Sequence, residues 1–535
     1  MFLREVVTGK RTARPLRYAQ IVEAYRNEAG QSRHRVMLSL GRVDQLDKEQ
    51  IRRLVVSLSR YLESGEVPEG GRVGEVRDFG LPHLVGALWT RLELPGFFKK
   101  QLRARKYKAP VERALLAMVT HRIVDPSSKL SCWDWLRNDA YLPDMDGIQL
   151  QHLYRAMDFL DTCHESLEEA LYEHRRDLFE EVKLVYYDTT STYFECDDPS
   201  DEPEQYGLRQ YGYSRDIRPD RRQIVVGLAV DQRGIPIASD VFSGDTSDQI
   251  TVVPMLTRLH GMGLRNVCWV ADRGMTSEKN LASVRAAGLH YIVGVRLRAA
   301  EDLRDAILKD EAPYAIVNDG LQVKEIRLHD KRYVVCFSPE SAARDLKLRT
   351  GAIDRMTPVL DSVNSGADAA AITEHGLYRR FVMRTAGGKF HLDKRKLERE
   401  AQCDGTFILE VSDHETTPEA AALAYKGLLR VEQSFRVLKH GVDVRPVYHR
   451  LDHRIRSHVT LCMLAYLMER VVEVEHGRPF EKVRRELARV RAVELTFHEQ
   501  TVWETGRVPA PLGRLYDDLR LKPPPRVLAT GPRIL

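Results

Sequence analysis

The run Val182-Lys183-Leu184-Val185-Tyr186-Tyr187-Asp188 decides the fold that we expect for this 535-residue chain. Valine, leucine and tyrosine favour a buried strand, and the run stops at a carboxylate, so we predict a strand that ends at Asp188. The stretch Asn266–Ala271 repeats the pattern and leads into Asp272. Because a sheet holds the side chains at its strand ends in place, both aspartates are candidates for a rigid chemical site.

The segments around these aspartates follow one another in a definite order. Two strands come after Asp188, joined by the tight turn Asp231-Gln232-Arg233-Gly234, and helices then alternate with strands. The predicted elements are strands at Gln223–Val230, Ile235–Phe242, Asn266–Ala271 and His290–Val295, and helices at Ser247–Leu259, Ser277–Ala287 and Thr417–His440. This β-β-β-α-β-α-β-α series predicts a mixed α/β core.

The length of the chain predicts several folded units. We expect a β-hairpin with a helix at the N-terminus, then a helical region, then an α/β core that a partly β insertion divides, and finally a peripheral tail. The expected boundaries are 1–70 for the hairpin and helix, 71–180 for the helical region, 181–300 and 405–476 for the core, 301–404 for the insertion and 477–535 for the tail.

The composition excludes several classes of protein. The net charge of +5 permits an acidic partner without requiring one. The sequence holds no long apolar run, no signal-peptide pattern and no glycine-rich nucleotide loop, so we expect neither a membrane span nor a nucleotide cofactor. The seven cysteines are scattered and form no C-x-x-C pair, which indicates free thiols in a reducing cytoplasm.

Glu432 is the third candidate carboxylate. Residues seven apart on a helix share one face, so Tyr425, Glu432 and Lys439 would form a stripe of hydroxyl, carboxylate and cation. Each residue alone is an ordinary surface or cap residue; the order of two strand-end aspartates and then a helical glutamate indicates a shared site. Three carboxylates suit Mg²⁺ or Mn²⁺, and two such ions serve in-line phosphoryl displacement.

At these residues the sequence resembles bacterial insertion-sequence transposases of the DDE superfamily, within the insertion-sequence-four branch that carries the motif Y-x2-R-x3-E-x6-K. Tyr425, Glu432 and Lys439 fall on that motif, whereas Leu428 stands at the arginine position, for which Arg430 and Arg436 are possible replacements. Further segments that resemble the family are Tyr187–Glu195, Gly212–Asp220, Phe242–Asp248, Ala271–Met275, Arg445–His449 and Arg454–His458.

The resemblance implies a ribonuclease-H-like core and two metal ions held by Asp188, Asp272 and Glu432. It also implies cleavage at the ends of a mobile element, transfer of the 3′-hydroxyl to target DNA, and a homodimer on paired DNA ends in the bacterial cytoplasm, with the nucleoid. Some members of the family stack a flipped base on an aromatic residue of the insertion. Residues 301–404 hold no tryptophan, so tyrosine or phenylalanine would have to serve.

Basic residues gather around the three carboxylates and suit contacts with DNA phosphates. The predicted DNA contacts are Tyr425, Arg215, Arg218, Arg273, Arg430, Arg436, Lys439, Arg445 and Arg454. We place recognition of the element's terminal repeats in the first 180 residues, although no helix-turn-helix pattern is visible there.

Two other functions stay open on the sequence alone. One is a ribonuclease-H-like, metal-dependent nuclease that hydrolyses DNA without joining it. The other is a DNA-binding regulator derived from a catalytically dead transposase, and the presence of all three carboxylates argues against it.

Overall fold

The computed structural model describes residues 2–8, 16–26, 32–42, 71–103, 105, 109–176, 182–195, 207–295, 301–318, 320–375, 378–497 and 500–532. The chain divides into two compact units. One comprises Met1–Gly74, Leu495–Val502 and Thr530–Leu535, and the other comprises Glu75–Glu494 and Trp503–Ala529. No helix among the described residues is long and apolar enough to cross a bilayer.

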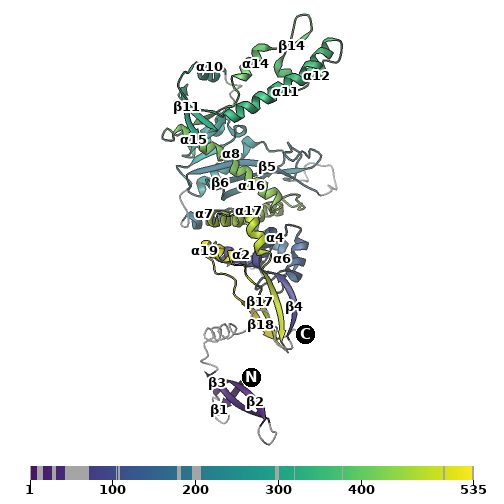
Figure 1. Cartoon of the computed structure of the whole chain (residues 1–535), viewed down its shortest axis with the longest axis vertical. Helices are drawn as coiled ribbons and strands as arrows, with labels where there is room; N and C mark the ends of the chain where they lie inside the picture. The colour runs from purple at the N-terminus through teal and green to yellow at the C-terminus, as the bar shows by residue number, and fades with distance from the viewer. Residues whose placement is uncertain are drawn as a thin grey trace. The chain divides into compact units, whose positions relative to one another are not determined.

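A mixed sheet forms the centre of the larger unit (Figure 1). Within the described ranges it has nine strands in the order β10-β11-β12-β15-β9-β8-β5-β6-β7. The strands are β5 (Leu184–Tyr193), β6 (Gln223–Asp231), β7 (Pro236–Ser243), β8 (Cys268–Ala271), β9 (His290–Val295), β10 (Ala315–Asn318), β11 (Leu321–Leu328), β12 (Lys331–Phe337) and β15 (Thr406–Val411).

The order of the strands and helices from β5 to β9 follows the series predicted from the sequence. β5, β6 and β7 are antiparallel neighbours, as hairpin-type connections require, whereas β8 runs parallel to both β5 and β9. Helix α8 (Asp248–Gly261) connects β7 to β8, and α9 (Glu278–Ala286) connects β8 to β9. The prediction of a mixed α/β core is therefore confirmed.

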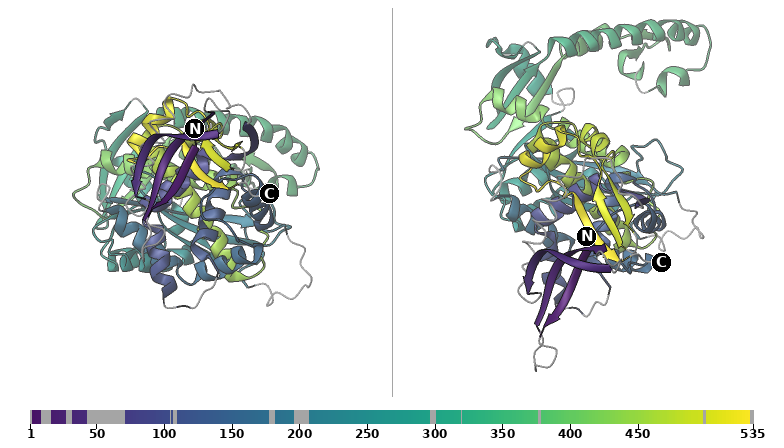
Figure 2. Two further views of the ribbon diagram at one scale, coloured as in Figure 1. Left: turned by 90° about the horizontal axis from the view of Figure 1, so that it is seen from below. Right: turned by 60° about the horizontal axis from the view of Figure 1, so that its bottom comes forward.

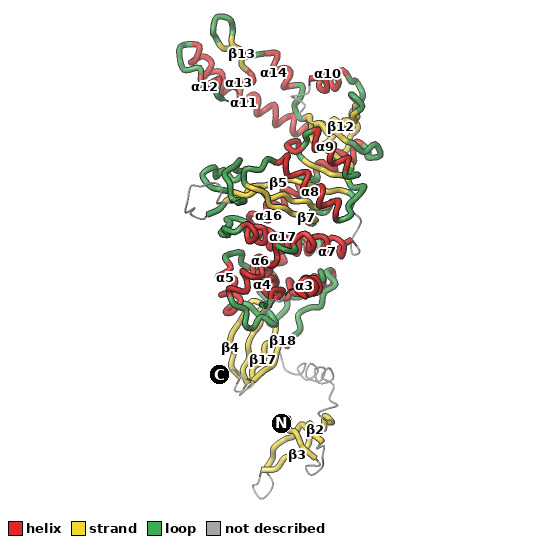
Figure 3. The backbone as a smooth tube through the Cα atoms, turned by 180° about the vertical axis from the view of Figure 1, so that it is seen from behind, coloured by secondary structure: helices red, strands yellow, loops and turns green. Residues whose placement is uncertain are grey.

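Helices cover both faces of this sheet (Figure 3). Ala229 of β6 packs into the core that α8 and α9 close, while its neighbours Leu228 and Val230 pack against the opposite helices, α16 (Leu429–His440) and α17 (Asp452–His476). Every residue of β6 is buried, because successive side chains of a strand point to opposite faces and both faces are covered.

A helical layer lies against α17, which is buried around most of its surface. Helices α4 and α6 contact α17 directly, and residues of α2, α3 and α5 belong to the same hydrophobic core. The helices of this layer are α2 (Gly80–Arg91), α3 (Leu94–Arg103), α4 (Val111–Val124), α5 (Lys129–Asn138), α6 (Leu150–Asp161) and α7 (His164–Arg176), in agreement with the predicted helical region.

The residues between β9 and β15 extend the sheet and then leave it. β10, β11 and β12 form a meander that joins the sheet where β12 pairs with β15. Beyond β12, a small separate core unites Met356 and Leu360 of the long helix α11 with Phe381 and Phe390. The right-hand view of Figure 2 shows α11 as the long green helix at its upper end. The remaining elements here are α10 (Glu301–Lys309), α11 (Pro339–Asn364), α12 (Ala370–Thr373), α13 (Tyr378–Phe381), β13 (Val382–Arg384), β14 (Phe390–Leu392) and α14 (Lys394–Ala401).

The N-terminus forms an antiparallel sheet of β1 (Phe2–Thr8), β2 (Leu16–Arg26) and β3 (Ser32–Arg42), in agreement with the expected β unit. The helix expected at Lys48–Leu62 lies outside the described residues.

The C-terminal residues correct one expectation. We expected a peripheral tail from 477 onward, but Leu487, Leu515 and Tyr516 are buried in the main core, because α18 and α19 carry apolar faces that pack on the helical layer. The elements at this end are α18 (Phe480–Leu487), α19 (Pro511–Asp518), and the strands β16 (Arg491–Phe497), β17 (Gln500–Thr505) and β18 (Val527–Pro532), which form a sheet in the order β18-β17-β16-β4 with β4 (Gly71–Asp78).

Candidate active site

Asp188 and Asp272 lie side by side because their strands are parallel neighbours. Tyr187 of β5 pairs with Ala271 of β8, and the two aspartates are the residues that follow. One detail differs from the prediction: β5 does not end at Asp188 but continues to Tyr193, because Thr189 and the residues after it keep pairing with β6. Asp272 does follow the last residue of its strand.

Glu432 reaches the same place from a broken helix. The predicted single helix Thr417–His440 is two helices, α15 (Pro418–Lys426) and α16, separated at Gly427 and Leu428. Gly427 packs against the side chain of Tyr186, so close that a β-carbon there would clash with the Tyr186 hydroxyl oxygen. The contact with β5 therefore fixes the junction, and Glu432 lies in the first turn of α16.

The three predicted carboxylates line one cavity of about 320 Å³. Asp188 is half-buried on the sheet, whereas Asp272 and Glu432 are exposed at its rim. The lining residues are Asp188, Thr189, Thr190, Arg215, Asp248, Asp272, Gly274, Met275, Glu432 and Phe435. Asp188 and Glu432, which lie 244 positions apart in the sequence, thus face the same open, polar cavity.

Asp248 is a fourth carboxylate in this cavity, and we did not predict it as a site residue. It begins α8, accepts a 2.6 Å hydrogen bond from the Thr189 hydroxyl group and forms a 2.6 Å ion pair with Arg215. The segment Phe242–Asp248 resembles the family, but nothing in its spacing indicated that Asp248 turns toward β5.

The surroundings of Asp188 raise its proton affinity. Burial raises the pKa of Asp188 to about 6; the hydrogen bond from the Thr189 amide and the charge of Arg215 oppose the rise, and the charges of Asp272 and Asp248 add to it. The Tyr425 hydroxyl group donates a 3.3 Å hydrogen bond to Asp272. Burial, followed by the charge of Asp272, raises the pKa of Tyr425 well above its usual value, so Tyr425 is a donor at neutral pH.

The donor set suits a hard cation, although the side chains are not gathered around one point. Among the residues described, no three Asp, Glu, His or Cys side chains lie close enough together to hold an ion as they stand. The cavity nevertheless offers carboxylate oxygens without thiolate or imidazole, which is the chemistry that Mg²⁺ and Mn²⁺ prefer. Burial, and to a smaller extent the charges of Asp272 and Asp248, raise the pKa of Asp188, and a bound cation would offset both effects.

The predicted DNA contacts divide into two groups. Arg215 lines the cavity, and Arg273 and Arg436 are exposed and form no ion pair with another described residue. All three reach solvent, and Arg215 does so while paired with Asp248 at 2.6 Å.

The other basic residues are held by the protein itself. Lys439 and Arg445 both pair with Asp216, at 2.7 Å and 2.6 Å. Arg454 pairs with Asp158 of α6 at 2.6 Å, and this ion pair joins α17 to the helical layer.

The two remaining arginines also have protein partners. Arg218 forms a bidentate pair with Asp220 at the surface. Arg430 lies beside the hydroxyl group of Tyr186, where burial raises the pKa of the tyrosine and the charge and hydrogen bond of Arg430 lower it.

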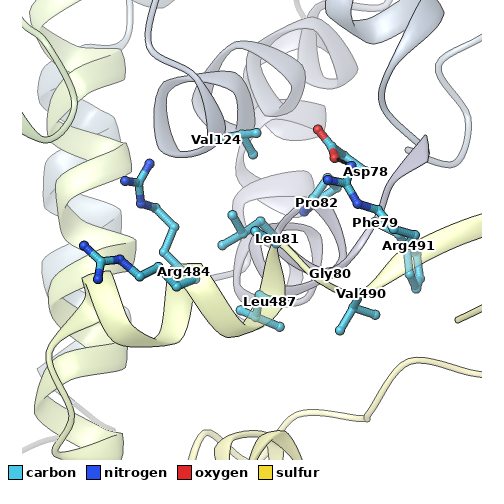
Figure 4. A pocket seen from close by; sticks show the side chains of 12 residues that line it. Asp78, Phe79, Gly80, Leu81, Pro82, Val124, Arg484, Leu487, Val490 and Arg491 are labelled. Carbon is cyan, nitrogen blue, oxygen red and sulfur yellow. Dashed lines mark ion pairs between the residues drawn. The ribbon is translucent and has the colours of Figure 1, made fainter. Parts of the chain in front are cut away.

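A second cavity, of about 310 Å³, has the opposite chemistry (Figure 4). It lies between the start of α2 and the end of α18, with an apolar wall of Leu81, Val124 and Leu487 and arginines at its rim. Its one acidic residue, Asp78, is paired with Arg491. The carboxylate cavity is therefore the candidate active site.

Fold and cavity together define a mixed α/β protein that brings carboxylates from distant segments to adjacent parallel strands. A family model described as "Transposase DDE domain" matches residues 194–468, just over half of the chain, and its match begins after Asp188 and includes Asp272 and Glu432. The chain belongs to the DDE transposase family. Its function class is therefore DNA transposition.

A second family model, "IS1634 family transposase, N-terminal domain", matches residues 5–69. The branch it names differs from the insertion-sequence-four branch that the Tyr425–Lys439 motif suggested. No curated protein matches the sequence.

The chain is also similar to solved transposase structures, at low identity. One is a piggyBac transposase synaptic complex with hairpin DNA, with 8% identity, a TM-score of 0.36, and coverage of 76% of this chain and 77% of that chain. Another is a Mos1 transposase paired-end complex with the left transposon end, with 10% identity, a TM-score of 0.15, and coverage of 35% and 60%.

Proposed function

We propose that the protein cuts DNA at the ends of its own mobile element and joins the exposed 3′-hydroxyl groups to target DNA. The observation that carries this proposal is the convergence of Asp188, Asp272 and Glu432 on one open cavity. In this reading, β5 to β9 with their helices are a ribonuclease-H-like core.

Asp188, Asp272 and Glu432 would hold two divalent ions, Mg²⁺ or Mn²⁺. Such ions supply an activated nucleophile and neutralise the leaving 3′-oxygen. The side chains at the rim, Asp272 and Glu432, are exposed and can turn toward the more buried Asp188.

Residues in and beside the cavity would hold its charged groups in position. Tyr425 orients the Asp272 carboxylate through its hydrogen bond, and Asp248 holds the Arg215 guanidinium group at the cavity, where it can contact a phosphate. Arg273 and Arg436 would bind the DNA backbone on either side.

We further propose a division of labour along the chain. Residues 1–70 and 71–180 recognise the element ends, 181–300 and 405–476 form the catalytic core, 301–404 are an insertion within it, and 477–535 complete the helical layer. Two ends must be cut together, so the active form would be a homodimer on paired DNA ends.

The test uses oligonucleotides copied from the ends of the element that encodes the chain, in uncut and pre-cut form, with a plasmid target. We expect nicking of the uncut ends and joining of the pre-cut ends, both dependent on Mg²⁺ or Mn²⁺. Asp188→Asn and Glu432→Gln should each lower both rates by roughly a thousandfold or more, as removal of a catalytic group does, while DNA binding persists.

The outcomes separate the alternatives. Hydrolysis without joined product would indicate a nuclease, and binding without either reaction would indicate a DNA-binding regulator. Undiminished cleavage by Asp188→Asn would remove the metal-ligand assignment.

A further inference from the structure

The segment 207–222, between β5 and β6, presents two apolar side chains to solvent. Ile217 is 88% exposed and Tyr213 is 87% exposed, the highest values for large hydrophobic side chains among the described residues. Arg215 stands between them and lines the carboxylate cavity. Large apolar groups held in water at the mouth of a site commonly mark a surface that a partner covers.

The backbone that carries these side chains is firmly held. The side-chain amide of Gln223 donates to the carbonyl oxygens of Tyr213, at 3.1 Å, and Gly244, at 2.9 Å. The amide of Arg215 donates to the Ser191 hydroxyl oxygen of β5 at 2.9 Å. The exposure of Tyr213 is therefore a built feature of the segment.

Ion pairs add a second anchor. Asp216 is almost buried, and one of its carboxylate oxygens forms ion pairs with both Lys439 of α16 and Arg445. Two basic residues of the Glu432-bearing region thus hold the segment 207–222 beside the cavity. Lys439 and Arg445 are positioning residues in this arrangement.

The backbone at Ile217 is strained. Its φ of +58° lies in the left-handed region, which a β-branched residue rarely adopts. Both the backbone conformation of Ile217 and the exposure of its apolar side chain are energetically unfavourable. Backbone strain of this kind concentrates where a protein contacts a ligand.

The charge of the segment identifies the kind of partner. Residues 207–222 contain five arginines and two aspartates. Arg209, Arg222 and Asp216 are largely buried, so the segment presents three cations, Arg215, Arg218 and Arg221, and one anion, Asp220, at its surface. An exposed aromatic ring among cations, next to a cavity proposed to act on a phosphodiester, suits a nucleic acid with an accessible base.

We propose that Tyr213 stacks on an unpaired base next to the phosphate in the cavity, with Ile217 wedged against the neighbouring base step. The inference rests on the proposed function only in taking DNA as the partner. It assigns base stacking to the segment between β5 and β6 and not to the insertion.

Binding without divalent metal tests this contact separately from catalysis. The full-length protein is titrated, in EDTA, with a short duplex that carries one unpaired 2-aminopurine and with its fully paired counterpart. We expect the wild type to prefer the unpaired form by about tenfold, within the range of base–aromatic stacking, and to quench the 2-aminopurine fluorescence. Tyr213→Ala should lose both effects and Tyr213→Phe should keep them.

A matched control and the melting temperature complete the design. Ile316→Ala removes another exposed apolar side chain, 75% exposed on β10, and should leave the preference unchanged. All three variants should melt at the temperature of the wild type, because the substituted side chains are exposed.

Each possible result is decisive. If Tyr213→Ala retains the preference for the unpaired base, the stacking contact is wrong while the proposed function stands. If the wild type binds neither duplex, the assumption of a DNA partner fails instead. If Tyr213→Ala dissociates an oligomer in sedimentation and leaves DNA binding unchanged, the segment contacts a second copy of the chain and the inference is overturned.

Discussion

Two clusters of like charges in the larger unit are accommodated in opposite ways. The carboxylates Asp188, Asp272, Asp248 and Glu432 line an open cavity. In the basic cluster where α4 and α5 meet α17, Lys129, Arg122, His121 and His458 are buried and His449 is half-buried; Lys129 is 5% exposed.

Access to solvent decides how the repulsion within each cluster of like charges is relieved. In the open cavity a soluble cation can enter, so the carboxylates can stay charged and act on a ligand. In the closed cluster no counter-ion can enter, and neutral forms are favoured: burial and then the charge of Arg122 lower the pKa of Lys129 to about 7, and burial lowers the pKa values of His121 and His449 to about 3. A cluster of like charges that solvent can reach therefore indicates a functional site, whereas a buried cluster of like charges indicates a structural role.

Lys129→Met should give the largest change in stability, and it depends on pH. The pKa of Lys129 falls from 10.5 unfolded to about 7 folded, so its penalty is complete below pH 7 and disappears as the pH rises toward 10.5. At pH 6 the free energy of unfolding of the variant should exceed that of the wild type by on the order of 4 kcal/mol. The loss of the hydrogen bond between Lys129 and His458 reduces this gain. By pH 10 the gain should have disappeared.

Urea unfolding at pH 6, 8 and 10 measures the difference. The control is Lys99→Met, at an exposed position of α3. Its free energy of unfolding should stay close to that of the wild type at all three pH values. A Lys129→Met advantage that is the same at every pH would show that the cluster is not charged below pH 7 and would end the comparison.

Added Mn²⁺ should stabilise the open cluster. Ion binding to the folded state raises the free energy of unfolding by about 2.7 kcal/mol at a free concentration one hundred times Kd. We expect a rise in melting temperature for the wild type and little or none for Asp188→Asn, with KCl at equal ionic strength as the control. An equal rise in both proteins would mean that the ion binds elsewhere.

Gly427→Ala tests whether the junction between α15 and α16 holds the cavity in shape. The new β-carbon would meet the hydroxyl group of Tyr186, so we expect a loss of about 2 kcal/mol on urea unfolding, as for overpacked cores, together with loss of DNA cleavage. Gly86→Ala in α2 is the control: nothing lies within 4 Å of its β-carbon position, and alanine should stabilise the helix by about 0.5–1 kcal/mol. A wild-type cleavage rate in Gly427→Ala would show that the Tyr186 contact is not needed.

The sequence was informative where local pattern and geometry coincide. The strand that contains Asp188 and the strand that precedes Asp272 follow from their composition, and parallel pairing of β5 with β8 then makes the two residues neighbours. The break at Gly427 was not predictable, because the apolar spacing of 417–440 continues through it and the reason is a contact with Tyr186.

The partners of charged residues were the least predictable feature. Lys439 meets Asp216, which lies 223 residues away, and Arg454 meets Asp158, which lies 296 residues away. From the sequence, an arginine that joins two helices looks the same as one that faces a phosphate.

Arg436 and Arg454 give the finest test of the difference between accessible and internally paired charge, and the smallest expected effect. Arg436→Gln removes an exposed cation of α16, so DNA binding should weaken and the slope of log K against log salt should fall by about 0.9 for one lost phosphate contact. Arg454→Gln breaks the pair with Asp158 and should lower stability by about 0.5–1 kcal/mol, with an unchanged salt slope. Filter binding over a salt series and urea unfolding of both variants make the measurement. If instead Arg454→Gln changes the salt slope, the ion pair must open when DNA binds, and Arg454 contacts DNA as the sequence predicted.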